Sequence, residues 1–224
     1  MLYLVATPIG NLKDITLRAI ETLKEVDLIL CEDTRHSLKL LNTYEIKKPL
    51  LSFHSHSKPQ RLEEILKYLQ EGKKVALITD AGSPCISDPG YKIVKLATQN
   101  NIQVSVLPGP CAAIAAVTAS GLPSDKFLYL GFMPQKKGRQ TLIKSFADTP
   151  SSVVIYESPF RVLKTLNQFQ ELLGERYISI SREISKLHEE VFTGTISMAI
   201  EKFEASKPKG EFVMVLAPKN YKYE

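Results

Sequence analysis

Thr79-Asp80-Ala81-Gly82-Ser83-Pro84-Cys85-Ile86-Ser87-Asp88-Pro89-Gly90 is the loop from which the fold of this chain can be worked out. The apolar run 74–78 before it reads as a buried strand, and a helical pattern begins after it at Tyr91. Ligands of open α/β sheets bind outside the carboxyl ends of the strands, which is where this loop lies. Its glycines allow close backbone approach and its prolines remove backbone donors, so it suits a ligand with hydroxyl groups, an amine or a positive centre better than a phosphate.

Strand-like runs alternate with helical runs on both sides of this loop. In the first 120 residues the strand-like runs are 2–6, 28–31, 50–53, 74–78 and 103–107, each followed by a helical pattern. Five such units predict a mostly parallel sheet covered by helices on both faces. The pattern breaks at 121–125, Gly-Leu-Pro-Ser-Asp, and then resumes, so we expect two α/β domains, 1–120 and 121–224.

Composition narrows the class of protein. Hydrophobic residues make up 44% of the chain and charged residues 24%, as in ordinary soluble proteins, and no apolar run approaches the roughly 20 residues of a membrane span. The first residues form no basic leader, so a cytoplasmic protein is expected. The three cysteines contain no Cys-x-x-Cys pair, which argues against disulfides and a metal site. The net charge of +5 permits a nucleic-acid partner without requiring one.

Three loops with glycine and proline follow strands of the first domain. They are Thr7-Pro8-Ile9-Gly10-Asn11-Leu12, the 80–90 loop, and Pro108-Gly109-Pro110-Cys111. Any one of them could be an ordinary strand-to-helix turn, but three together favour a pocket. The chain has neither G-x-G-x-x-G nor G-x-x-x-x-G-K-[ST], so a standard dinucleotide or P-loop nucleotide site is not expected.

Four charged clusters are candidates for function. Glu32-Asp33-Thr34-Arg35-His36 follows the second strand; Asp33 or Thr34 could cap the next helix, and the others could face a substrate. His54 and His56 form either a solvated pair or a substrate contact. The other two clusters are Lys136, Lys137 and Arg139, which could be a solvated helix start or a phosphate contact, and Arg182 with Glu183 after a later strand.

Taken together, these motifs resemble one known family, the ribosomal RNA small subunit methyltransferase I (RsmI) branch of the tetrapyrrole methylases. The matching segments run in order along the whole chain: 4–12, 31–36, 80–91, 108–113, 121–125, 131–134, 156–161, 182–183 and 209–211. The resemblance implies two α/β domains of the tetrapyrrole methylase type with the cofactor in the interdomain cleft, and a homodimer. It also implies 2′-O-methylation of a cytidine in the decoding region of 16S ribosomal RNA, with S-adenosylmethionine as methyl donor.

The resemblance also assigns residues. By the family pattern the cofactor would contact Pro8, Asp80, Ala81, Gly82, Ser83, Ile86, Cys111, Ala112, and the surroundings of Glu157 and Ile184. Independently of the resemblance, the candidates for the general base or for orienting the substrate are the charged residues at strand ends that would face the cleft: Glu32, Asp33, Arg35, His36, Arg182 and Glu183. A methylase of a small tetrapyrrole and a non-catalytic RNA-binding module remain as alternatives. Many members carry a further helical segment after the last strand, which this sequence lacks. The sequence therefore does not show how the protein would bind the ribosomal subunit.

Overall fold

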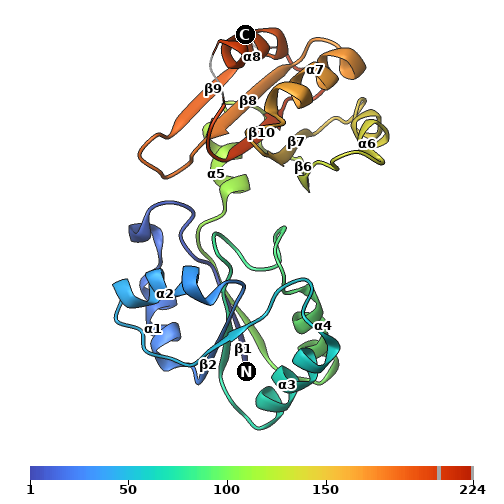
Figure 1. The fold of residues 1–224 in the computed structure, drawn as a ribbon. Coiled ribbons are helices and arrows are strands. Elements are labelled where there is room, and N and C mark those ends of the chain that lie inside the picture. Colours follow the sequence, from blue (N-terminus) through green and yellow to red (C-terminus); the bar gives the residue numbers. More distant parts are fainter. Residues whose placement is uncertain (206–207, 223–224) are drawn as a thin grey trace. The chain divides into compact units, whose positions relative to one another are not determined.

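A computed structural model describes residues 1–205 and 208–222 of the chain (Figure 1). The chain forms two compact units, residues 1–111 and 112–224. We expected the division after residue 120, but helix α5 (Ala112–Ala119) packs against strands of the second sheet and belongs to the second unit. Within the described ranges no helix is long and apolar enough to cross a membrane.

The first unit alternates strands and helices as predicted. Its elements are β1 (Leu2–Val5), η1 (Leu12–Asp14), α1 (Leu17–Glu25), β2 (Leu28–Cys31), α2 (Thr34–Thr43), β3 (Leu50–Ser52), α3 (Pro59–Gln70), β4 (Val75–Leu77), α4 (Tyr91–Gln99) and β5 (Val104–Leu107). The strands form one sheet in the order β3-β2-β4-β1-β5, and every pair is parallel. Residue Leu4 pairs with Leu77 on one side and Val106 on the other, which aligns the carboxyl ends of the central strands.

Helices cover both faces of this sheet (Figure 1). Helices α1 and α2 pack on one face through an apolar cluster that includes Leu23 and Leu41, and α3 and α4 pack on the other through Ile65 and Ile93. Successive strand residues alternate between the two clusters, because side chains of a strand point to opposite faces. The expected mostly parallel, doubly covered sheet is confirmed.

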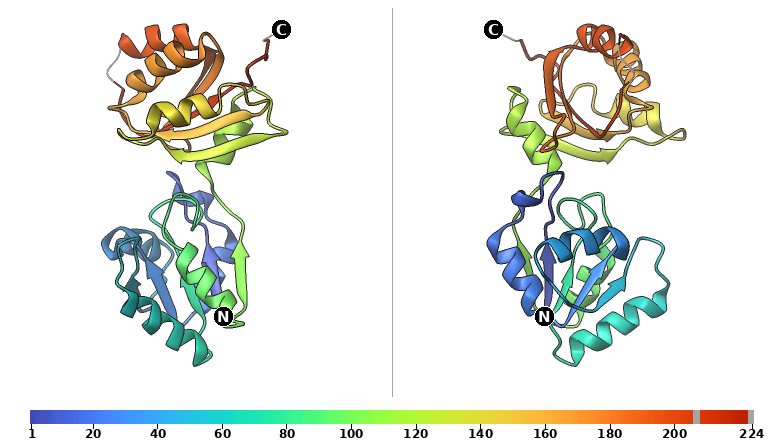
Figure 2. Two further views of the ribbon diagram at one scale, coloured as in Figure 1. Left: turned by 90° about the vertical axis from the view of Figure 1, so that its right-hand side faces the viewer. Right: turned by 60° about the vertical axis from the view of Figure 1, so that its left-hand side comes forward.

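The second unit has a mixed sheet. Its elements after α5 are β6 (Phe127–Phe132), α6 (Arg139–Ser145), β7 (Ser152–Glu157), α7 (Val162–Leu173), β8 (Tyr177–Arg182), β9 (Glu190–Thr195), α8 (Ile196–Glu204) and β10 (Phe212–Leu216). The strand order is β6-β7-β10-β8-β9; β6 and β7 are parallel and the other pairs are antiparallel. Helices α6, α7 and α8 share one apolar cluster with the sheet, whereas α5 lies on the opposite side (Figure 2).

Candidate functional site

The three loops that follow β4, β1 and β5 meet at one edge of the first sheet. Thr7 and Gly82 exchange both backbone hydrogen bonds, at 2.9 and 3.0 Å, so the loop after β1 is paired to the loop after β4. The Ser83 hydroxyl donates to the Pro110 carbonyl at 3.2 Å and joins the loop after β5 to the same group. The convergence of the three loops in the first unit is therefore confirmed, and its cause is the adjacency of their strands.

Two buried threonines hold this arrangement and were not singled out from the sequence. The Thr7 hydroxyl donates to the Thr79 carbonyl at 3.1 Å, and the Thr79 hydroxyl donates to the Ala81 carbonyl at 3.1 Å. Both side chains are almost completely inaccessible to solvent. These hydrogen bonds occupy the carbonyls of Thr79 and Ala81 on the protein side. The carbonyls of the 79–90 loop that point outward are the ones that a ligand could reach.

The backbone of the 79–90 loop is unusual. Gly82 has a φ of +85°, and the non-glycine residues Cys85 and Ser87 also lie in the left-handed region, at +71° and +63°. The two non-glycine conformations cost about 1–3 kcal/mol each, and such strain collects at functional sites. Gly82 is buried against Ile9 and Pro110, whereas its neighbour Ala81 is exposed. The turn is thus fixed from behind and presents its outer side to solvent.

Three carboxylates lie together at this edge of the sheet. Burial first, and then the charges of Glu32 and Asp80, raise the pKa of Asp88 to about 6. Burial and Asp80 also raise the pKa of Glu32, and His54 opposes the increase. Asp80 accepts a hydrogen bond from the backbone N–H of Asp33 at 3.4 Å. Glu32, Asp80 and Asp88 form an acidic group in which Asp88, with its raised pKa, is the member suited to accept a proton near neutral pH. Asp88 is also the member that sequence analysis did not propose.

The remaining residues of the cluster after β2 have local structural partners. Asp33 is the N-cap of α2 and accepts the N–H of Arg35 at 2.8 Å, which was one of the two capping alternatives. The hydrogen bonds from Arg35 lower the pKa of Asp33 to about 2. An exposed 3.0 Å ion pair joins the same two side chains. His36 is exposed in the first turn of α2. Asp33 and Arg35 therefore serve the start of the helix, whereas Glu32 belongs to the acidic group.

Arg139 was expected in a basic loop that contacts RNA, and the structure corrects this. Its side chain is only 3% exposed, and its guanidinium contacts Glu157 at 3.3 Å, Gln168 at 2.6 Å and the Pro134 carbonyl at 3.0 Å. The guanidinium is therefore a buried structural cation of the second unit and is inaccessible to a phosphate. Lys136 and Lys137, by contrast, are exposed.

Glu157 lies at the centre of that network. Its side chain is completely buried, and it pairs with Arg161 at 2.7 Å and accepts the Thr165 hydroxyl at 2.7 Å. The carboxylate is therefore fully occupied by protein partners. A cofactor near this position would have to contact the surrounding backbone or exposed neighbouring residues. The family pattern likewise places the cofactor at the surroundings of Glu157.

Arg182 and Glu183 support a turn of the second unit. The Arg182 guanidinium donates to the Lys209 carbonyl at 2.7 Å and pairs with Glu190 at 3.3 Å. Glu183, at a φ of +52°, accepts the backbone N–H of Glu211 at 2.8 Å. These contacts give both side chains a structural role in the turn, and the acidic group of the first unit is the better candidate for a general base. Ile184, between them and Ser185, is half-buried.

The family follows from comparison with known proteins. A family model described as Tetrapyrrole (Corrin/Porphyrin) Methylases matches residues 1–199. Over 97% of this chain and 98% of the relative, the sequence is 51% identical to the Ribosomal RNA small subunit methyltransferase I of Thermotoga maritima. The protein of the same name from Synechocystis sp. is 48% identical over 97% of this chain and 78% of its own length.

The chain belongs to the ribosomal RNA small subunit methyltransferase I family. Solved structures agree on the fold: diphthine synthase superposes with a TM-score of 0.75 at 14% identity, covering 99% of this chain and 91% of that one. Uroporphyrin III C-methyltransferase from Thermus thermophilus gives 0.67 at 19% identity, with 97% of each chain covered. At these identities the likeness concerns the fold alone.

The other residues expected to contact the cofactor have the following places in the structure, and their contacts with the cofactor stay predictions. In the first unit Pro8 is buried, Ile86 is exposed, and Cys111 is half-buried after Pro110. In the second unit Ala112 begins α5, and the next backbone N–H, that of Ala113, donates to the Tyr156 hydroxyl at 3.2 Å. Among the described residues, no three side chains of the metal-ligating types come close enough to hold an ion.

Proposed function

We propose that this protein transfers a methyl group from S-adenosylmethionine to the 2′-hydroxyl of a cytidine in 16S ribosomal RNA. The observation that carries the proposal is the joining of three loops at one sheet edge, in a chain 51% identical to a protein named as a small-subunit ribosomal RNA methyltransferase. The named relatives support the small-subunit substrate. The cytidine and the ribose position come from the resemblance of the motifs.

The loop residues fit the cofactor. Outward carbonyls of the 79–90 loop accept from hydroxyl and ammonium groups, and the Asp80 carboxylate favours a positive charge. The position of an added Cβ at Gly82 lies 3.5 Å from Ile9 Cγ2, so the turn is supported from the protein side and its shape is fixed before a ligand binds. The proposed contacts are Pro8, Asp80, Ala81, Gly82, Ser83, Ile86 and Cys111, with Ala112, Ile184 and the surroundings of Glu157 from the second unit.

When bound, the cofactor supplies an activated methyl group, and the protein must orient the ribose and accept a proton. Positioning alone can contribute about 7–11 kcal/mol to such a reaction, and a general base typically adds about 10²–10⁴-fold. We assign the base to the acidic group. Asp88 has a pKa of about 6, which suits proton transfer near neutral pH, and Glu32 shares its environment.

The protein's charge and assembly complete the proposal. Lys136 and Lys137 are exposed beside the start of α6 and would contact phosphates of the RNA.

The protein would work in the cytoplasm as a homodimer. Sedimentation equilibrium would then show about twice the 25.1 kDa mass of the chain.

Transfer of labelled methyl groups tests the function. Purified protein is incubated with methyl-labelled S-adenosylmethionine and small ribosomal subunits that lack the modification. Label in the ribosomal RNA supports the proposal, and Asp88→Asn should slow transfer by about 10²-fold or more. If no label appears in the RNA, the methyltransferase proposal is rejected, and the alternative of a non-catalytic RNA-binding module is favoured.

A further inference from the structure

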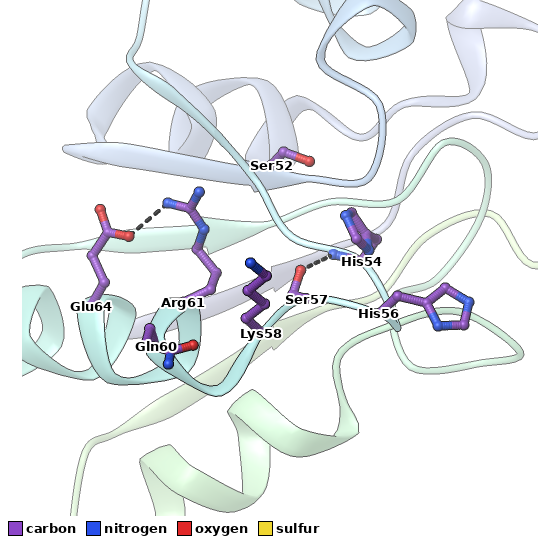
Figure 3. Close-up of a pocket in the computed structure, with 8 residues that line it drawn as sticks. All are labelled: Ser52, His54, His56, Ser57, Lys58, Gln60, Arg61 and Glu64. Carbon is purple, nitrogen blue, oxygen red and sulfur yellow. Dashed lines mark hydrogen bonds and ion pairs between the residues drawn. The ribbon is translucent and has the colours of Figure 1, made fainter.

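The first unit has a second feature that the proposed function does not use, a pocket beside strand β3. It has a volume of about 420 Å³ and lies between the end of β3 and the first turn of α3 (Figure 3). All eight residues that line it are of polar or charged types: Ser52, His54, His56, Ser57, Lys58, Gln60, Arg61 and Glu64. A pocket of this composition suits a charged ligand rather than an apolar one.

The charges of the lining favour an anion. One ammonium, that of Lys58, and one guanidinium, that of Arg61, stand against one carboxylate, that of Glu64, and the two imidazole rings add hydrogen-bonding N–H groups. Glu64 pairs with Arg61 at 2.6 Å and also accepts the Tyr68 hydroxyl at 3.3 Å, so its charge is already matched. Lys58 forms no ion pair with any described residue. In Figure 3 the side chain of Lys58 extends from the helix start, whereas the Arg61 guanidinium is turned to Glu64.

Backbone and hydroxyl groups add to this preference. Helix α3 is twelve residues long and begins at Lys58 and Pro59 without a side-chain cap, so its positive end is not neutralised by the protein. The Ser57 hydroxyl accepts the His54 backbone N–H at 2.9 Å, which leaves its own proton available to a ligand oxygen. The lined pocket and its unmatched lysine carry the inference, and the helix start strengthens it.

The pocket lies next to the proposed catalytic edge. Strand β3 pairs with β2, and the Ser52 hydroxyl donates to the Glu32 carbonyl at 3.2 Å. His54 is close enough to Glu32 to affect its pKa. A group held in this pocket would therefore lie beside the acidic group within the same unit.

We propose that the pocket formed by His54, His56, Ser57, Lys58 and Arg61 binds a backbone phosphate of the substrate RNA, close to the ribose that is methylated. This inference rests on the proposed function and adds to it a phosphate contact in the first unit. An RNA strand carries a phosphate on each side of every ribose, so one contact here fixes the strand while its 2′-hydroxyl faces the carboxylates. The acidic group would otherwise repel RNA, and the pocket offsets that repulsion.

Binding measurements on matched lysine variants test the pocket. Lys58→Gln removes a cation from the lining, and Lys67→Gln removes an exposed cation of the same helix outside it. A single-stranded, cytidine-containing RNA of twelve nucleotides is titrated at several salt concentrations without cofactor. For Lys58→Gln we expect the slope of log K against log salt to fall by about 0.7, with Lys67→Gln unchanged. Lys58→Glu should weaken binding further.

The outcomes separate this pocket from the proposed function. An unaltered slope for Lys58→Gln, or an equal fall for Lys67→Gln, would overturn the pocket even if the wild-type protein methylates RNA. Conversely, a loss of slope confined to Lys58 supports the pocket even if no methyl group is transferred. Phosphorus NMR with inorganic phosphate forms a second arm: broadening that depends on Lys58, together with an unaltered RNA slope, would show a small-anion site and reject the RNA contact. Circular dichroism confirms that each variant is folded.

Discussion

Gly82 is the residue on which the shape of the proposed cofactor site depends most. Its φ of +85° is unfavourable for any residue with a Cβ, and its backbone is paired to Thr7. Gly82→Val should lower stability by about 1–3 kcal/mol and abolish binding of S-adenosylmethionine, measured by calorimetry.

Gly72 provides the matched control. Its φ is +84°, but no atom lies within 4 Å of the position of an added Cβ, and it precedes β4, at the end of that strand opposite to the 79–90 loop. Gly72→Val should carry a similar strain and leave cofactor affinity intact. Unchanged affinity in Gly82→Val, or an equal loss in both variants, would reject the assignment of the loop.

Asp88 makes a prediction about pH. Its pKa of about 6 in the folded protein lies above the value of 3.8 expected without the fold, so the folded state binds more protons between these values. Stability therefore decreases as pH rises from about 4 to 6, and the penalty is fully present above pH 6. Asp88→Asn should remove a penalty of about 1–2 kcal/mol at pH 7, after allowance for partial exposure.

Urea unfolding of both proteins from pH 4 to 7 measures this difference. The stability of Asp88→Asn relative to wild type should increase with pH across that range. A difference that does not vary with pH would show that folding does not raise the pKa of Asp88. Asp33 has the opposite sign, because Arg35 lowers its pKa to about 2 and the charged form is favoured by folding.

At the scale of single residues the sequence could identify loop glycines but not the environment of charges. The motif around Lys136 and Arg139 reads as one basic cluster, yet an exposed lysine in the loop before α6 lies only three residues from a buried arginine at the start of that helix. What decides between them is the position of Glu157, which is brought in by another strand and is invisible in the local pattern. Asp88 was missed for a related reason: its burial and its proximity to Glu32, which follows β2, are set by the fold and cannot be read from the loop that it shares with Asp80.

The network around Glu157 joins β7, α6 and α7 of the second unit. Arg139, Arg161 and Thr165 all contact this one carboxylate inside the unit. Removing one partner of a buried ion pair typically costs about 3–5 kcal/mol, because it leaves an unmatched charge. Arg139→Gln should therefore destabilise the second unit by about that amount in calorimetric unfolding.

Lys137→Gln is the comparison for this prediction. The side chain is exposed two residues away, and its removal should change stability by no more than about 0.5 kcal/mol. Equal stability of Arg139→Gln and Lys137→Gln would contradict the structural role given to Arg139.

The elements themselves were predictable where periodicity is strong. All five strands of the first sheet and the helices between them follow from alternating apolar runs, because parallel strands covered on both faces leave a simple pattern. The domain boundary did not follow. In the sequence, the small-residue helix α5 reads as the last helix of the first domain. Only its contacts with β7, β8 and β10 show that it belongs to the second unit.

At the scale of the whole molecule, RNA binding should depend on a few exposed cations rather than on net charge. Lys136→Gln combined with Lys137→Gln should lower the slope of log K against log salt by about 1.4 for single-stranded RNA. Lys92→Gln combined with Lys95→Gln, on exposed positions of α4, controls for the same change in total charge. If both pairs have the same effect, the loop before α6 is not a specific contact.

The position of the transferred methyl group tests the central claim most directly. Small-subunit RNA labelled by the wild-type protein is hydrolysed with alkali, which spares the bond beside a 2′-O-methyl ribose, and the resistant dinucleotides are identified. We predict that the label lies in a resistant dinucleotide whose methylated residue is cytidine. Label released as an ordinary mononucleotide, with the methyl group on a base, or no label in the RNA, would contradict it.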